Sequence, residues 1–213
     1  MGFMWDCSTD DPRAQRAHKR LQEIRSAACT LVIERGYDGF TMDDLAEAAG
    51  VSRRTLFNYV PDKASAVLGP DGVGDNPQVA LFRDGGPTGV LMPDLIQALD
   101  SVMSEVEDPS MASDQHALVE RAIASDGKVA HLAFERFTHL SDTLATLICE
   151  REKWDAGDLR ARTITATFLA IVKVSLEEFS LRKADSDFMT VFHDVMTVFH
   201  DVLDADAAVR SMR

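Results

Sequence analysis

The segment over residues 40–63 (FTMDDLAEAAGVSRRTLFNYVPDK) contains the start and stop signals of two short helices. Thr41, followed three residues later by an aspartate, has the pattern of a capping box at a helix N-terminus. Gly50 suits the left-handed position that ends a helix, and Ser52 can cap the next helix. Pro61 disfavours helical geometry at the residue before it. The segment therefore predicts a helix-turn-helix, in which two helices are joined by a turn of three or four residues.

Helical periodicity also dominates the rest of the 213 residues. Apolar residues recur at intervals of three and four, and no stretch alternates in the manner of a strand bounded by turn residues. We therefore expect an all-α protein with helices over residues 13–35, 42–49, 53–59, 90–106, 112–125, 128–152, 159–183 and 187–205, and a short helix that starts at Lys63.

The charge distribution predicts that the chain has two functional parts. We expect a flexible N-terminus over residues 1–12, a helix-turn-helix domain over 13–68, a connector with one helical turn near Val79–Phe82 over 69–89, and a helical body over 90–213. The net charge is −13, but residues 13–68 hold nine Lys and Arg against seven Asp and Glu. A slightly basic front section joined to an acidic body indicates separate roles for the two parts.

Composition predicts a cytoplasmic protein. No apolar run approaches the ~20 residues that span a bilayer, and the acidic first residues lack the basic start and apolar core of a secretory signal. Cys7, Cys29 and Cys149 lie too far apart for a disulfide framework or a metal site, and they suit a reducing compartment. We therefore expect no membrane partner, no bound metal and no cofactor.

The second helix of a helix-turn-helix presents its N-terminal residues to base edges in the major groove of DNA. Here these residues are Arg53 and Arg54, and arginine suits bidentate hydrogen bonds to guanine. The helix that follows Thr41 can face a phosphate with its N-terminus. Tyr59 and Lys63 lie just beyond the second helix, where side chains hold the DNA backbone. The predicted DNA contacts are Thr41, Ser52, Arg53, Arg54, Thr55, Asn58, Tyr59 and Lys63, with plain packing open for Thr55 and a solvated face open for Asn58.

Residues 13–68 resemble the N-terminal domain of the TetR family of transcriptional regulators. The family pattern is a long first helix that ends in Gly-aromatic, followed by T-x-x-x-[LI]-A-x-x-A-G-V-S-x-x-[TL]-L-[YF]-x-[HY]-[FV]-x-x-K. The chain matches this pattern at Gly36, Tyr37, Thr41, Leu45, Ala46, Ala49, Gly50, Val51, Ser52, Thr55, Leu56, Phe57, Tyr59, Val60 and Lys63. Phe57 lacks the phosphate-binding hydroxyl of the tyrosine common in the family, and Asp43 stands where some members have a basic or polar residue.

The resemblance implies a homodimer that binds a palindromic operator in double-stranded DNA and is released by a small-molecule effector. We expect a repressor, with activation left open. An effector held between the helices of residues 90–180 would tilt the short helix that starts at Lys63. An apolar or aromatic effector is expected, although the acidic body also suits a cationic one. Candidate lining residues, whose composition equally fits a plain core, are Met103, Phe134, Phe137, Leu140, Trp154 and Phe168.

The resemblance also implies that the last two long helices pair with those of a second protomer as a four-helix bundle. Residues 159–183 are apolar nearly all round, and a monomer would struggle to bury such a helix. The sequence MTVFHDV at 189–195 recurs unchanged at 196–202, which places both copies on one helix face with coiled-coil-like spacing. The expected dimer residues are Ile164, Phe168, Ile171, Val172, Phe179, Phe188, Phe192, Val195, Phe199 and Val202.

Two other classes of protein are alternatives. A small-molecule enzyme is not supported by any activated nucleophile, metal cluster or phosphate loop, so we expect no enzyme activity. A helical small-molecule-binding or interaction protein would keep the helix-turn-helix only as structure, and it would not bind DNA. His131, Glu135 and His139 follow i, i+4, i+8 spacing and could serve as metal ligands, but a solvated helix face is favoured.

Overall fold

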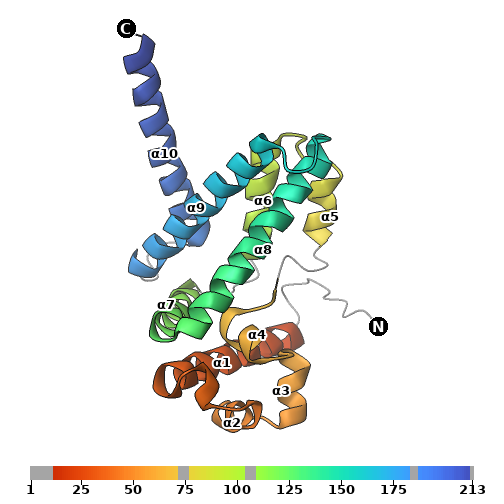
Figure 1. The fold of residues 1–213 in the computed structure, drawn as a ribbon, viewed down its shortest axis with the longest axis vertical. Coiled ribbons are helices and arrows are strands. Elements are labelled where there is room, and N and C mark those ends of the chain that lie inside the picture. The colour runs from red at the N-terminus through yellow and green to blue at the C-terminus, as the bar shows by residue number, and fades with distance from the viewer. Residues whose placement is uncertain (1–11, 72–76, 104–108, 183–186, 212–213) are drawn as a thin grey trace. The chain divides into compact units, whose positions relative to one another are not determined.

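The computed structural model describes residues 12–71, 77–103, 109–182 and 187–211, and every regular element within these ranges is helical (Figure 1). The expected all-α fold is therefore confirmed. One element, η1, is a single 3₁₀ turn that periodicity does not reveal. The elements are α1 (Pro12–Arg35), η1 (Tyr37–Gly39), α2 (Met42–Ala48), α3 (Arg53–Tyr59), α4 (Lys63–Leu68), α5 (Pro77–Arg83), α6 (Leu91–Met103), α7 (Pro109–Ser125), α8 (Gly127–Glu152), α9 (Leu159–Arg182) and α10 (Phe188–Ser211).

The helix ends agree best with the sequence where a local capping signal exists. The bounds of α3 are the expected ones, and α2 ends one residue early. The helical turn expected in the connector is the longer helix α5, and α10 continues to Ser211. Residues 104–106, the expected end of a helix, lie outside the described residues, as do residues 1–11 of the expected flexible N-terminus.

The first compact unit joins the front of the chain to a corner formed much later in the sequence. It takes the residues up to Asp71 together with Ala117–Glu135, which contain the α7–α8 corner. Burial of one aliphatic side chain stabilises a fold by about 1.5–3 kcal/mol relative to exposure. Each helix of this unit contributes a fully buried side chain to one core, namely Ile24, Leu45, Leu56, Val67, Ala122 and Val129.

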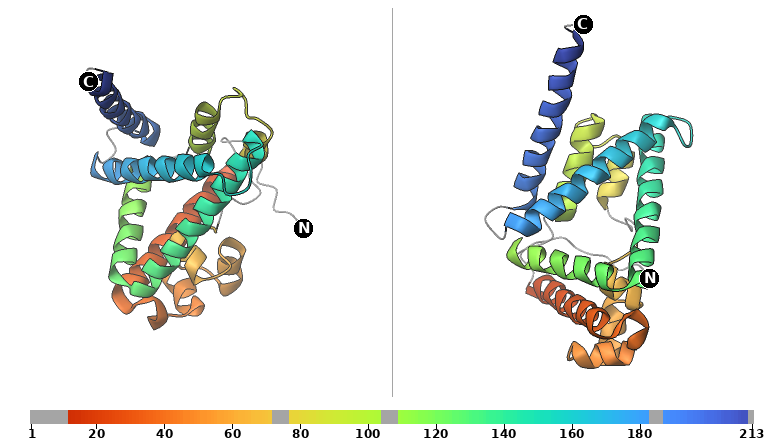
Figure 2. Two further views of the ribbon diagram at one scale, coloured as in Figure 1. Left: turned by 45° about the horizontal axis from the view of Figure 1, so that its top comes forward. Right: turned by 60° about the vertical axis from the view of Figure 1, so that its left-hand side comes forward.

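The second compact unit contains α5, α6, α9, α10 and the remaining parts of α7 and α8. Helix α10 packs beside α9, and its C-terminal end extends beyond that contact (Figure 2). Aromatic rings join the two helices edge to face. The ring centres are 6.0 Å apart in both the Phe168–Phe192 pair and the Phe179–Phe188 pair. The core of this unit therefore combines the α9–α10 contact with buried side chains of other helices of the same chain, such as Phe82, Leu95 and Ile148.

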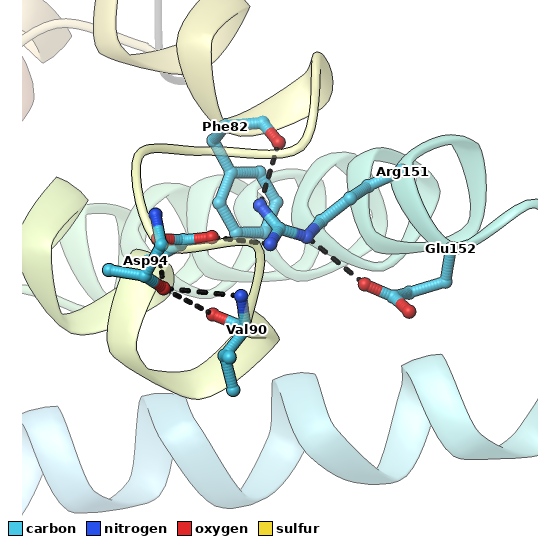
Figure 3. A network of polar contacts seen from close by, with 6 residues as sticks. Phe82, Val90, Asp94, Arg151 and Glu152 are labelled. Atoms are coloured by element: carbon cyan, nitrogen blue, oxygen red, sulfur yellow. Dashed lines mark hydrogen bonds and ion pairs between the residues drawn. The ribbon is translucent and has the colours of Figure 1, made fainter.

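A buried ion pair fixes the loop between α5 and α6 (Figure 3). Arg151 of α8 pairs with Asp94 of α6, and the two side chains are 2% and 0% exposed. Arg151 also donates from Nη1 to the Phe82 carbonyl oxygen at 3.0 Å. Burial acts to raise the pKa of Asp94, but hydrogen bonds from Thr88 and Arg151 outweigh it and hold that pKa below 3.8. Sequence reasoning missed this pair because its partners are 57 residues apart.

Candidate nucleic-acid interface

A complete capping box fixes the start of α2, as the sequence predicts. The Asp44 backbone N–H donates to Thr41 Oγ1 at 3.2 Å, and the Thr41 backbone N–H donates to Asp44 Oδ2 at 2.7 Å. The Thr41 hydroxyl also donates to the same carboxylate. The side-chain and backbone hydrogen bonds from Thr41 lower the pKa of Asp44 below 3.8. Two helix-end donors are thereby satisfied within the motif.

The turn between α2 and α3 follows the predicted chemistry. Gly50 has a φ of +63°, the left-handed conformation that glycine adopts without a steric penalty. Ser52 caps α3, because its Oγ accepts the Thr55 backbone N–H at 3.0 Å. The hydroxyls of Ser52 and Thr55 lie 2.7 Å apart and share a hydrogen bond. Their hydroxyls therefore serve the cap, and DNA contact by Ser52 and Thr55 stays a prediction.

Both candidate base-reading arginines are exposed at the start of α3. Arg53 is held from two sides. Its Nη1 donates to both carboxylate oxygens of Asp43, at 2.9 and 2.8 Å, and its guanidinium carbon lies 5.6 Å from the centre of the Phe57 ring. Asn58, further along α3, is also exposed. The buried Leu56 anchors α3 to the core, while Arg53, Arg54 and Asn58 of the same helix are left exposed.

Lys63 has a structural role that the sequence does not reveal. Its Nζ donates to the carbonyl oxygens of Tyr37 and Phe40, at 2.6 and 2.9 Å, and it lies 4.6 and 4.7 Å from the centres of their rings. An ammonium has three N–H donors, so one donor remains. Tyr59 is half-buried and packs against the core of the first unit. Phosphate contacts by Lys63 and Tyr59 stay predictions.

The α7–α8 corner is tied to the turn that precedes α2. Asp126 accepts backbone N–H groups of Lys128 and Val129 through Oδ1, at 2.8 and 3.1 Å, which caps α8. Its other oxygen, Oδ2, accepts the Tyr37 backbone N–H at 2.8 Å. These backbone hydrogen bonds, led by that of Tyr37, lower the pKa of Asp126 below 3.8. Lys128 also pairs with Asp38 at 2.6 Å. Sequence reasoning missed this link, because Asp126 and Tyr37 are 89 residues apart.

The expected effector-lining residues do not all lie inside the protomer. Phe168 is buried in the core of the second unit, called the second core below, and Met103 and Trp154 pack against that core. Leu140 is half-buried. Phe134 and Phe137, in contrast, are 67% and 49% exposed. Helical spacing shows which residues share a face, but it does not show whether another helix covers that face. A site enclosed within the protomer therefore does not include these two rings.

The expected dimer residues also divide into buried, partly buried and exposed side chains. Five of them are buried in the protomer's own core, namely Phe168, Ile171, Phe179, Phe188 and Phe192. Ile164, Val172, Val195 and Phe199 are partly buried against that core, whereas Val202 is 64% exposed. The exposed large apolar side chains of α9 and α10 share only Val202 with the expected set: Leu159, Val174, Leu181, Val198, Val202 and Leu203. A stripe that suits a coiled coil is here covered largely by the neighbouring helix of the same chain.

The histidine stripe on α8 lies on the surface. His131 and Glu135 approach to 3.4 Å, with side chains 69% and 58% exposed, and His139 is also exposed. Across residues 12–71, 77–103, 109–182 and 187–211, no group of three potential ligands is placed to hold a metal ion. Within the same residues, no helix is long and apolar enough to cross a membrane.

Comparison with known proteins agrees with this geometry. Residues 24–66 match the model of the "Bacterial regulatory proteins, tetR family". The chain is 28% identical to the HTH-type transcriptional regulator TcmR of Streptomyces glaucescens over 185 residues, which are 82% of this chain and 79% of the relative. It is also 39% identical to the uncharacterized HTH-type transcriptional regulator YdeS of Bacillus subtilis over 57 residues, 27% of each chain.

The capped helix-turn-helix with exposed arginines and the two relatives define a transcriptional regulator with a DNA-binding domain. The match over residues 24–66 identifies the DNA-binding domain of the TetR family in this chain.

Solved structures of regulators also match most of the chain, at low similarity. A putative TetR-family regulator from Mesorhizobium loti matches with a TM-score of 0.36 and 16% identity, covering 88% of this chain and 98% of its own. The fatty acid degradation regulator FadR from Bacillus halodurans matches with the same TM-score and identity, covering 90% and 96%.

Proposed function

We propose that the protein is a ligand-responsive repressor that binds a palindromic operator as a homodimer. The observation that carries the proposal is the pair of exposed arginines at the start of α3, on a helix fixed by its cap and by the buried Leu56. The N-terminal residues of such a helix meet base edges in the major groove. We expect contacts with bases or phosphates from Arg53, Arg54, Thr55 and Asn58. Tyr59 would hold the DNA backbone.

A selection of bound sequences from a random duplex pool tests the DNA-binding part. The native chain and an Arg53→Ala/Arg54→Ala double variant are compared in parallel, with far-UV circular dichroism to confirm that both are folded. A palindrome enriched by the native chain alone supports the proposal. Its half-sites should repeat about 34–36 Å apart or at a multiple of that distance. Absence of any enrichment at low salt would instead favour a helical binding protein whose helix-turn-helix is only structural.

Salt dependence supplies an independent measure of the same interface. If each protomer neutralises about four phosphates, the logarithm of the binding constant should fall against the logarithm of salt concentration with a slope of about −7. The proposed contact residues lie in a section, residues 13–68, with nine Lys and Arg against seven Asp and Glu, on a chain of net charge −13. A slope near zero would mean that the enriched duplex is not held through its phosphates.

For the dimer, the exposed apolar side chains of α9 and α10 supply surface that a second protomer could bury. Val198 and Val202 are 63% and 64% exposed one turn apart on α10. Val202→Glu should shift the protein from dimer to monomer in light scattering, with unchanged helix content, because a carboxylate would be buried at the contact. A Val202→Glu protein that stays dimeric would exclude this face.

The effector is expected to be largely apolar with at least one polar group. The second core is rich in aromatic and aliphatic side chains, and the Thr165 hydroxyl is fully buried there without a hydrogen-bond partner among the described residues. A buried unpaired hydroxyl is destabilising, and a bound polar group would relieve that penalty. Effector and operator must then oppose each other reciprocally. A thermal-shift screen followed by release of the enriched duplex tests this, with cationic compounds included.

A further inference from the structure

Arg53 is held in one orientation although it lies on the surface. Asp43 of α2 accepts from Nη1 of Arg53 with both oxygens, and Phe57, one turn further along α3, lies against the guanidinium. The arginine and aspartate side chains are 64% and 63% exposed. An ion pair this exposed contributes little to stability, because water screens the charges and both side chains lose rotamer freedom. The two contacts therefore restrict the side-chain conformation of Arg53 but add little to the stability of the fold.

The donors that remain on Arg53 have the geometry that guanine requires. A guanidinium carries five N–H groups in a rigid planar fork. With Nη1 directed to Asp43, the described structure gives Nε and Nη2 no partner, and these two nitrogens present adjacent donors on one edge. Guanine presents two adjacent acceptors, O6 and N7, in the major groove. Because the fork is already oriented, less side-chain freedom is lost when it meets a base.

The charge of Asp43 also shifts Arg53 from phosphate binding towards base reading. A carboxylate beside the guanidinium offsets its positive charge and repels nearby phosphates. Attraction to phosphates is independent of sequence, whereas base-edge hydrogen bonds are not. The carboxylate therefore weakens general attraction to any duplex more than it weakens a directed contact with guanine.

We propose that Asp43 and Phe57 preset Arg53 as a guanine-reading fork, which makes Asp43 a specificity-determining residue of this regulator. The inference rests on the proposed function, because it assigns a base and a supporting residue to the same DNA interface. It also gives roles to the two positions at which the chain differs from many members of the family. Phe57 lacks a hydroxyl but supplies a ring under the arginine, and Asp43 supplies an orienting carboxylate.

The test uses the duplex that the native full-length chain enriches from a random pool. Arg53→Ala first identifies the base pair that Arg53 reads, as the position whose preference disappears. Asp43→Ala then removes the orienting carboxylate. Glu47→Ala is the matched control, because Glu47 is an exposed acid on the same helix, one turn later, and its removal changes the net charge equally. Binding constants are measured for the enriched duplex, for duplexes substituted at that base pair, and for an unrelated duplex.

We expect the native chain to prefer guanine at the Arg53 position by about tenfold, and Asp43→Ala to reduce that preference to about threefold or less. Both Asp43→Ala and Glu47→Ala should bind the unrelated duplex about twofold more tightly, since each removes one negative charge. Only Asp43→Ala should change the guanine preference. Phe57→Leu, which keeps an apolar side chain but removes the ring, should weaken it in the same direction.

Three results would overturn the inference while the regulator function stands. The first is an unchanged guanine preference in Asp43→Ala. The second is a sharper preference in that variant, which would mean that Asp43 sequesters Arg53 from DNA. The third is an Arg53→Ala protein that keeps every base preference of the native chain. If the native chain enriches no duplex at all, the proposed function fails, and the inference fails with it.

Discussion

Replacing Gly86 with alanine tests whether the buried ion pair of the second unit is rigid. Gly86 has a φ of +68°, and a Cβ added there would overlap the Asp94 carboxylate and lie 2.8 Å from Nη1 of Arg151. Gly89, in the same loop, has a φ of +73° and no described atom within 4 Å of its added Cβ. Gly89→Ala is therefore a control that shares the backbone strain but not the overlap.

The two substitutions should differ by the cost of displacing the pair. An alanine in the left-handed conformation costs about 1–2 kcal/mol, and both variants carry that penalty. Separating a buried ion pair costs a further 3–5 kcal/mol or so, and only Gly86→Ala carries this second penalty. We therefore expect Gly86→Ala to lower the free energy of unfolding by about 4–7 kcal/mol and Gly89→Ala by about 1–2 kcal/mol.

Urea unfolding followed by far-UV circular dichroism measures the difference. All samples need one protein concentration, because the proposed dimer would make apparent stability depend on concentration. Equal losses in Gly86→Ala and Gly89→Ala would refute the reasoning, since they would mean that the α5–α6 loop moves aside without disturbing Arg151. A loss in Gly89→Ala as large as that expected for Gly86→Ala would show that backbone strain alone accounts for the effect.

Three further substitutions test other contacts. Thr165→Val should raise the free energy of unfolding by about 1 kcal/mol, because it removes a buried unpaired hydroxyl at nearly constant volume, and a loss in urea unfolding would show that the hydroxyl has a partner. The Arg160 side chain and backbone N–H lower the pKa of Asp158 from 3.8 to about 2, so this carboxylate stabilises the fold above pH 3.8 and loses its effect towards pH 2. The stability deficit of Asp158→Asn should therefore be present at pH 6 and shrink between pH 4 and pH 2, and a deficit independent of pH would contradict the assignment. Asp126→Ser should keep the cap of α8 but lose the bond to Tyr37, and so weaken binding to the enriched duplex, whereas Asp187→Ser, the same change at the cap of α10, should not.

The helix-turn-helix could be predicted because its determinants are local. The Thr41 capping box, the Ser52 cap and the bounds of α3 each depend on residues within a few positions of one another. The hydrogen bond between Asp126 and Tyr37 and the Arg151–Asp94 pair could not, because they join residues 89 and 57 positions apart. A single sequence carries no signal of which distant turn a given carboxylate will reach.

The last two helices show a different limit of sequence reasoning. The spacing of Phe188, Phe192 and their neighbours identifies an apolar stripe, and that stripe is indeed largely covered. Periodicity does not say which chain covers it. In the structure α9 and α10 cover much of each other within one chain. The apolar side chains that stay exposed are Val174 and Leu181 on α9 and, at the end of the repeat, Val198 and Val202 on α10.

The placement of Asp126 bears on how an effector could release DNA. Helix α8 begins in the first compact unit and ends in the second, and its first turn is capped by the carboxylate that also binds Tyr37. Tyr37 begins η1, and its carbonyl oxygen accepts from Lys63, the first residue of α4. A displacement of the first turn of α8 would therefore reach the turn before α2 and the start of α4 together. The tilt of α4 expected from the sequence need not begin at α4 itself, because Asp126 connects the corner of α8 to the same turn.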